Sequence, residues 1–497
     1  MKTSLKNPSP ASPSSRILLL AVAGSLVLSS GAFAQIKTWV SGTAGDFTVA
    51  GNWSPSGVPS TSDVITETGI TPNTLQITST TSIAGIVQNQ SSGIWTINET
   101  SAAGTISLIV SGTIVKTNSG TLNIRRSSPA LLKVDVGTID VSAGMLEFGN
   151  QAHANGILQM SSAATKVSGG QLVFDVNNNN YSLGDVNISG GTITLSTDNQ
   201  DASGQTVAVT SLVGTGGTIQ GITTTGTGTT GPNPITLAVN QATNTSVSTV
   251  LTNGNAGVYN ILSLTKSGTG SLTLAANNTY TGTTVVSAGT LLINGSNTAS
   301  AVTTGSGARL GGSGTMGAIT VQSGGNLAPG NASAILTSSM ATFSGSTSVF
   351  GVGIASTGTS GAVSLGGSHY DQMVLTGTSG SAETVLSLSN STLQLTLTGS
   401  PVSLDKYFVV VLQDALDSST GSFAWATDGI STVAITGGAF TLGGQGYTIG
   451  YAGDSATNSL TGGNDIVVQV VPEPASIFLL GIGLAGLACR ARYRRSA

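Results

Sequence analysis

The densest group of reactive side chains in this sequence lies between residues 125 and 153. It holds two arginines, three carboxylates and a histidine: Arg125, Arg126, Asp135, Asp140, Glu147 and His153. Carboxylates that converge beside a base can act as general acid and base on a polysaccharide. Arg125 and Arg126 are adjacent, however, and on a strand they would point to opposite faces. We therefore interpret the group as scattered surface residues and keep a polysaccharide lyase or hydrolase as the alternative.

Elsewhere the residue types needed for catalysis or metal binding are sparse. No Asp or Glu occurs between Asp201 and Asp371, and His153 and His369 are the only histidines. A zinc cluster is therefore not expected. Asp198 and Asp201 are interpreted as a polar loop rather than a calcium site. The sequence predicts a chain that is not an enzyme and uses neither a cofactor nor a metal.

Charge is scarce throughout the chain. Charged residues make up 7% of the sequence, against about 25% in ordinary globular domains. Residues 35–470 hold 9 basic and 19 acidic side chains, a net charge of −10, so no basic footprint for nucleic acid exists. Cys489, the single cysteine, lies outside this range, so no disulfide is expected there.

Short strands recur at a steady interval along the interior. A glycine followed two positions later by an aliphatic residue appears at Gly120, Gly144, Gly170, Gly191 and Gly217. Periods of about 20–26 residues indicate a solenoid, and the alternating runs between them are typical of half-buried strands. Stacked coils would place one aliphatic residue above the next in an internal column: Leu122, Leu146, Leu172, Ile193 and Ile219. Threonines would then point outward, and a β-sandwich array is the alternative.

One segment, residues 264–296, strongly resembles the autotransporter-associated β-strand repeat. The residues that carry the resemblance are Lys266, Gly268, Gly270, Leu272, Leu274, Asn278, Tyr280, Gly282, Thr284, Gly289 and Leu291. The resemblance implies an all-β chain folded as a right-handed parallel β-helix. We expect the glycines to turn the corners, because glycine accepts positive φ without strain.

The first 34 residues predict a secretory signal peptide. A basic leader precedes an apolar run over 17–28, and the small residues Ala32 and Ala34 form the recognition motif for signal peptidase, just before the expected cleavage site. The mature chain is expected to begin near Gln35.

The C-terminal end carries a second predicted targeting signal. Val471, Pro472, Glu473 and Pro474 precede an uncharged stretch that ends at Cys489, and four arginines follow: Arg490, Arg492, Arg494 and Arg495. As a helix this stretch would be about 24 Å long, a marginal membrane anchor with its arginines in the cytoplasm. The arrangement resembles the PEP-CTERM sorting signal. The resemblance implies export, transient inner-membrane anchoring, processing by an exosortase-type membrane protease and a link to exopolysaccharide or biofilm. A plain tail anchor is the alternative.

The predicted organisation follows from these features. It comprises a signal peptide over 1–34, an N-terminal β cap over 35–100, β-helix repeats over 101–345, a second β region over 346–470 and the sorting signal with its transmembrane helix over 471–497. Trp39 and Trp53 are expected to cover the first coil. We expect an exported, non-enzymatic protein of the cell surface or matrix. A carbohydrate-binding adhesin, with both tryptophans exposed to sugars, is a further alternative.

Overall fold

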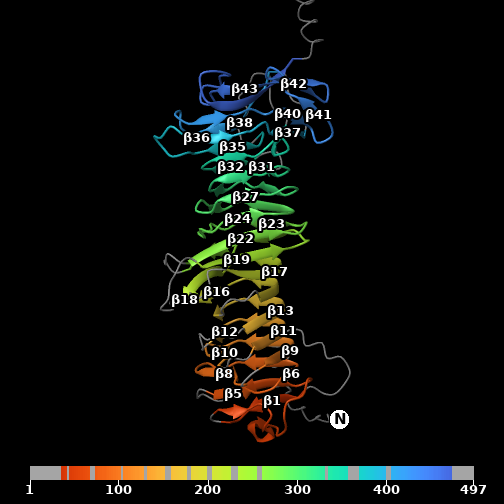
Figure 1. Cartoon of the computed structure of the whole chain (residues 1–497), viewed down its shortest axis with the longest axis vertical. Helices are drawn as coiled ribbons and strands as arrows, with labels where there is room; N and C mark the ends of the chain where they lie inside the picture. The colour runs from red at the N-terminus through yellow and green to blue at the C-terminus, as the bar shows by residue number, and fades with distance from the viewer. Residues whose placement is uncertain are drawn as a thin grey trace, which may run out of the picture. The chain divides into compact units, whose positions relative to one another are not determined.

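The computed structural model describes residues 35–472 except 42–43, 68–72, 102–103, 128–130, 151–157, 176–180, 199–203, 225–232, 255–259, 331–333, 356–368 and 399–403. Within these residues the secondary structure is β-strand, apart from one 3-10 turn, η1 (Ala50–Asn52) (Figure 1). The predicted all-β fold is therefore confirmed. The chain divides into two compact units, residues 1–162 and 163–497, and each is described by itself.

The first unit begins with three short strands and continues as two parallel ladders. The short strands are β1 (Ile36–Trp39), β2 (Gly45–Asp46) and β3 (Trp53–Ser54). One ladder contains β4 (Val64–Glu67), β6 (Thr81–Ile83), β7 (Gly85–Gln88), β9 (Thr105–Lys116) and β11 (Leu131–Val141). The other contains β5 (Asn73–Ile77), β8 (Ile94–Glu99), β10 (Thr121–Arg126) and β12 (Met145–Asn150).

The second unit stacks its coils in four parallel ladders. The first contains β15 (Tyr181–Ile188), β17 (Gln205–Gly214), β19 (Asn233–Asn240), β22 (Asn260–Ser267), β24 (Thr284–Val286), β27 (Val302–Thr304), β30 (Ile319–Val321), β33 (Ala341–Phe343), β36 (Thr384–Ser387) and β39 (Ser418–Thr420). The second contains β20 (Thr245–Val247), β23 (Ser271–Leu274), β25 (Thr290–Ile293), β28 (Arg309–Gly311), β31 (Asn326–Ala328), β34 (Val349–Ile354), β37 (Thr392–Leu397) and β40 (Trp425–Thr427).

The third ladder contains β14 (Gln171–Asp175), β16 (Thr192–Asp198), β18 (Thr218–Thr224) and β21 (Val250–Thr252). The fourth contains β26 (Ser296–Asn297), β29 (Thr315–Met316), β32 (Ile335–Ser338), β35 (Gln372–Leu375) and β38 (Lys406–Leu412). Strand β13 (Leu158–Val167) crosses the division between the units.

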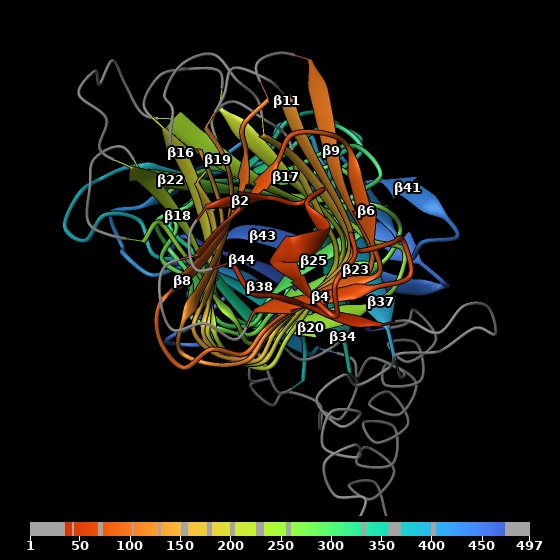
Figure 2. The same cartoon turned by 90° about the horizontal axis from the view of Figure 1, so that it is seen from below.

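The predicted aliphatic column forms within each unit. Leu122 pairs with Leu146 in the first unit, and Leu172, Ile193 and Ile219 pair in succession in the second. All five side chains are buried. Seen along the coils, the strands of a ladder lie one behind another (Figure 2). One buried aliphatic residue therefore sits above the next, and the β-helix is the correct choice over the β-sandwich array.

The parallel coils extend further than the predicted boundaries. They begin at β1 and β2, which pair in parallel with β4 and β5 before residue 101, and continue through β39 and β40, well past residue 345. The later coils could not be recognised from the repeat interval because the loops that connect their strands are longer. Asn326 pairs with Val349 after 23 residues, whereas Val349 pairs with Thr392 after 43. Ladder pairing needs the strands in register, not loops of constant length.

The last coil of the second unit is closed by antiparallel strands. Strand β38 pairs with β44 (Asp465–Val471), which pairs with β43 (Gln445–Gly453) and through it with β42 (Ala439–Leu442). Strand β41 (Thr432–Ala434) folds back on β40. A parallel ladder left open would expose unpaired backbone groups, so these strands cap the stack (Figure 1).

Candidate functional site

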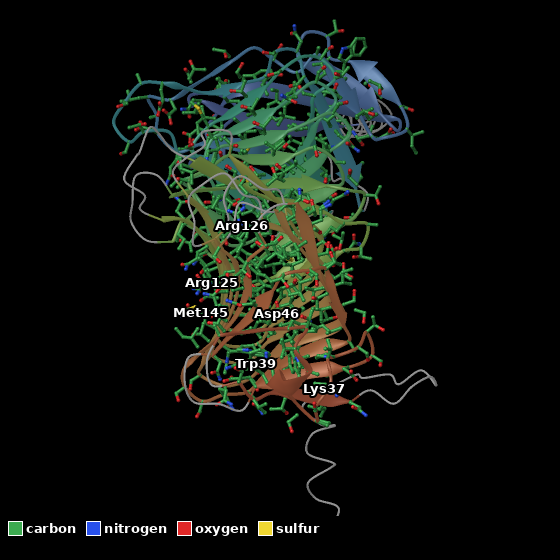
Figure 3. All side chains as sticks on the ribbon, turned by 60° about the horizontal axis from the view of Figure 1, so that its bottom comes forward. Lys37, Trp39, Asp46, Arg125, Arg126 and Met145 are labelled. Atoms are coloured by element: carbon green, nitrogen blue, oxygen red, sulfur yellow. The ribbon has the colours of Figure 1, made fainter. Side chains whose placement is uncertain are left out.

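Trp39 and Trp53 form a buried aromatic cluster at the start of the first unit. Strands β1 and β3 pair antiparallel and place the two residues opposite each other. The rings meet edge to face at 5.1 Å, and Phe47 packs on Trp53 at 5.4 Å. Trp53 Nε1 donates to the Phe47 carbonyl at 3.0 Å. Only 1% of Trp39 and 2% of Trp53 is exposed, so the expectation that both rings are exposed to sugars is wrong; Trp39 is labelled in Figure 3.

The carboxylate group predicted around residue 140 is divided between the two ladders of the first unit. Asp135 and Asp140 lie on β11, whereas Glu147 lies on β12. Asp135 is exposed and accepts a hydrogen bond from Ser161 Oγ at 2.6 Å. Asn123 Nδ2 donates to Glu147 Oε2 at 3.3 Å. Across the residues that the structure describes, no three His, Cys, Asp or Glu side chains form a metal site. His153 lies outside these residues.

Arg125 and Arg126 alternate on β10, as their adjacency predicts (Figure 3). Arg125 is half-buried, and Arg126 is buried completely. Burial lowers the pKa of both guanidinium groups; Glu147 opposes that shift for Arg125 and Glu99 opposes it for Arg126. Each arginine therefore interacts electrostatically with a carboxylate of a neighbouring coil.

The repeat motif places a buried lysine at a corner of the second unit. Lys266 is completely buried at the end of β22. Its Nζ donates to the carbonyl oxygens of Ser267 at 2.6 Å, Gly268 at 3.1 Å and Ala288 at 3.5 Å. The Ser267 carbonyl also accepts from the Gln241 amide of the preceding coil at 3.3 Å, so the ammonium group is a second donor there and serves the Gly268 and Ala288 carbonyls at the turn. We call this arrangement a lysine corner.

The other motif residues also have structural roles. Leu272, Leu274 and Leu291 are buried in the interior. Tyr280 Oη and Thr284 Oγ1 share a buried hydrogen bond at 2.7 Å. Asn278 Oδ1 accepts from the Leu251 amide at 2.9 Å, and its Nδ2 donates to the Ala276 carbonyl at 3.1 Å.

The motif glycines mark close approaches between coils. A Cβ at Gly270 would lie 2.1 Å from the Thr243 carbonyl oxygen, and one at Gly282 would lie 2.3 Å from that of Leu262. Gly268 and Gly289 adopt φ of 73° and 66°. Glycine is needed at these four positions because a side chain would strain the backbone or collide with the next coil.

Sequence reasoning missed a second lysine corner, at Lys116 in the first unit. Lys116 is completely buried, and its Nζ donates to the Asn118 carbonyl oxygen. Burial lowers its pKa to about 8. The Ser142 amide donates to the Lys116 carbonyl at 2.8 Å, just as the Ser287 amide donates to that of Lys266 at 2.9 Å.

The signal for this second corner was present in the sequence. Both lysines are followed by glycine at the fourth position and leucine at the sixth, and both coils continue with a Val-Ser-Ala-Gly run, at 141–144 and 286–289. Gly144 and Gly289, which end these runs, have the same φ of 66°. Two distant segments thus fold into one local geometry.

A line of hydroxyl side chains crosses the outer face of the second unit. Five residues pair in succession along the first ladder: Thr303, Thr320, Thr342, Ser387 and Thr420. They are half-buried or exposed, while their neighbours on each strand are mostly buried. We call this line the hydroxyl ladder. Its side chains recur at the strand spacing of about 4.8 Å.

The folded body ends where the predicted sorting signal begins. Val471 is the last residue of β44, and Gln445 Nε2 donates to its carbonyl oxygen at 2.6 Å. Pro472 follows. The remaining signal residues, from Glu473 and Pro474 to the arginines, lie outside the described residues, as do Ala32 and Ala34. The described residues include no helix long and apolar enough to cross a membrane.

Stacked parallel coils with lysine corners define a β-helical repeat protein. Residues 264–293 match the passenger-associated-transport-repeat, and residues 470–495 match the PEP-CTERM protein-sorting motif. No curated protein matches the chain. The two matches confirm both resemblances. The chain carries an exosortase sorting signal, which implies export, transient membrane anchoring and processing by an exosortase-type protease before it reaches the cell surface.

Proposed function

We propose that this exported chain is not an enzyme and acts by holding extracellular polysaccharide against its hydroxyl ladder. The observation that carries the proposal is the ladder itself: Thr303, Thr320, Thr342, Ser387 and Thr420 are uncharged and stacked in register. On this view the protein belongs to the exopolysaccharide or biofilm matrix, where a long neutral sugar polymer is the partner.

The chemistry of the ladder suits a neutral polymer. Each hydroxyl is both a donor and an acceptor, as are the hydroxyls of a sugar. Binding between two neutral faces avoids the high cost of desolvating ions. Because the side chains are fixed on paired strands, little conformational entropy is lost on binding. Single contacts of this kind are weak, but a polymer that meets several rungs at once gains from their effective concentration.

The hydroxyls can be removed without altering shape. Thr320→Val together with Thr342→Val keeps two β-branched side chains on the same strands and deletes both hydroxyls. The matched control is Thr192→Val with Thr218→Val, which pair with each other on the third ladder and whose side chains are also half-buried. We expect the first pair to reduce retention on exopolysaccharide from the producing cells at least tenfold and the control to leave it unchanged. Equal retention by both pairs would refute a binding role for the hydroxyl ladder.

The absence of catalysis is tested separately. Purified chain incubated with the same polysaccharide should release neither new reducing ends nor unsaturated sugars. Turnover that disappears in Asp135→Asn or Glu147→Gln, but persists in Asp428→Asn, would establish the lyase or hydrolase instead.

A further inference from the structure

Two corner loops of the second unit stack and bring three carboxylates together. Residues 376–383 connect β35 to β36, and residues 413–417 connect β38 to β39. The strands on both sides pair in parallel, β35 with β38 and β36 with β39, so one loop lies directly over the other. Glu383 belongs to the first loop, and Asp414 and Asp417 belong to the second.

Asp417 is the unusual member of this group. Only 3% of it is exposed, and neither carboxylate oxygen has a hydrogen-bond partner within the part of the chain that the structure describes. Its carboxylate faces the backbone of the other loop: a Cβ on Gly377 would lie 2.5 Å from Oδ2 and 2.8 Å from Oδ1. Burial raises the pKa of Asp417, the charges of Asp414 and Glu383 raise it further, and the backbone amide of Asp414 opposes part of the rise. A buried carboxylate without a partner is unfavourable unless a cation or a proton neutralises it.

The surrounding groups are held in place by the backbone. Asp414 accepts from the Gly380 amide at 2.7 Å and from the Leu416 amide at 3.0 Å. Glu383 accepts from the Thr378 amide. Asn464 Nδ2, from the loop before β44, donates to the carbonyl oxygens of Asp414 and Asp417 at 2.9 and 3.0 Å. Three segments thus fix the carboxylates before any ligand arrives.

We propose that Asp417 ligates a calcium ion between these two loops, with Asp414 and Glu383 contributing negative charge around it. No three side chains of the described residues complete a metal site by themselves, so backbone carbonyl and water oxygens supply the remaining ligands. Ca²⁺ accepts six to eight oxygen ligands in flexible geometry, whereas Mg²⁺ requires a near-ideal octahedron. A site built from loop carbonyls and a single direct carboxylate therefore suits Ca²⁺.

The expected affinity is that of an extracellular module. Such sites bind Ca²⁺ with Kd of about 10⁻⁴–10⁻³ M. The ion joins two successive coils close to the capping strands, so it stabilises the end of the stack from which the sorting signal emerges. The proposal does not depend on the hydroxyl ladder.

The test is equilibrium dialysis of the full chain in detergent against Ca²⁺ at about 1 mM, with thermal unfolding as a second readout. We expect one bound Ca²⁺ per chain, a Ca²⁺-dependent rise in Tm, and slower amide exchange over residues 376–383. Asp417→Asn is nearly isosteric and removes a repelling charge, so the variant should fold and should bind Ca²⁺ at least tenfold more weakly. The control Asp428→Asn changes a carboxylate that accepts only from nearby amides of the β40–β41 hairpin.

Two results would overturn the proposal. One is the absence of bound Ca²⁺ on the unmodified chain at this concentration, in which case Asp417 is neutralised by a proton. The other is Ca²⁺ binding that Asp417→Asn leaves as strong as Asp428→Asn does, because the ion would then lie elsewhere.

Discussion

Replacing Lys266 by Met is the sharpest test of the lysine corner. Met is close to Lys in length and keeps the apolar part of the side chain, but it has no donor. The Gly268 carbonyl oxygen, which Nζ reaches at 3.1 Å, would lose its donor inside the corner. The Ser267 carbonyl oxygen, 2.6 Å from Nζ, would keep the Gln241 amide at 3.3 Å as a donor. The Ala288 carbonyl at 3.5 Å is too distant to add much.

The magnitude follows from the bond to Gly268. A buried acceptor left without a donor costs about 1–3 kcal/mol. The low end applies here because removing the ammonium group also removes the cost of burying it, which is the cost that lowers the pKa of Lys266. One carbonyl without a donor gives a loss of about 1 kcal/mol. In a solenoid, where each coil contacts its neighbours only, this loss should remain local.

Hydrogen exchange on the full chain measures this local loss. Amides over residues 264–293 should exchange about fivefold faster in Lys266→Met, since 1.4 kcal/mol corresponds to a factor of ten. Lys116→Met should do the same for its own coil in the first unit. Lys133→Met, on an outward position of β11, is the control and should have little effect. If Lys266→Met accelerates exchange no more than Lys133→Met, the corner carbonyls do not need the ammonium group and the reasoning fails.

Three further predictions concern the interior. Leu291→Ala opens a cavity between Leu272 and Leu310, its partners on the neighbouring coils. It should lower the free energy of unfolding, measured in urea, by about 2–5 kcal/mol. The control Thr290→Ala should change the free energy of unfolding by no more than about 0.5 kcal/mol. Burial lowers the pKa of Lys116 from 10.5 to about 8, so between these values the unfolded chain holds a proton that the folded chain has released. Tm should therefore rise with pH from about 8 to 10, and a Lys116→Met chain that shows the same rise would exclude this lysine as the cause. Trp53→Phe should lower Tm, since it removes the hydrogen bond to Phe47 and part of the ring packing, but should leave exopolysaccharide retention unchanged; reduced retention by the folded variant would argue that the aromatic cluster contacts sugar.

Several features could be predicted from the sequence because they depend on local chemistry. The repeat signature from Lys266 to Leu291 encodes a turn, a close approach and an alternating strand within about 30 residues, so its geometry follows from spacing. The aliphatic column also follows, since a parallel ladder in register must stack one coil's inward residue on the next. The sorting signal is a linear motif, so all the residues that define it lie in one continuous segment of the sequence.

Other features could not be predicted because they depend on packing and hydrogen bonding with residues distant in the sequence. Trp39 and Trp53 could equally have formed an exposed platform, and their burial became clear only from the antiparallel pairing of β1 and β3. The coils beyond residue 345 were hidden by loops of unequal length. Lys116 carries the same spacing as Lys266, but only the matching hydrogen bonds around both lysines make the two corners equivalent.

The sequence by itself therefore determined the repeat, the inward column and the export address, because each is written in the spacing of residues along one stretch of chain. Only the tertiary structure decided which side chains are covered and which charges meet. Glu383 and Asp417 are 34 positions apart, and nothing in their local sequence joins them. They come together because two parallel ladders hold successive corners one above the other, and burial and electrostatic interaction are set by that stacking.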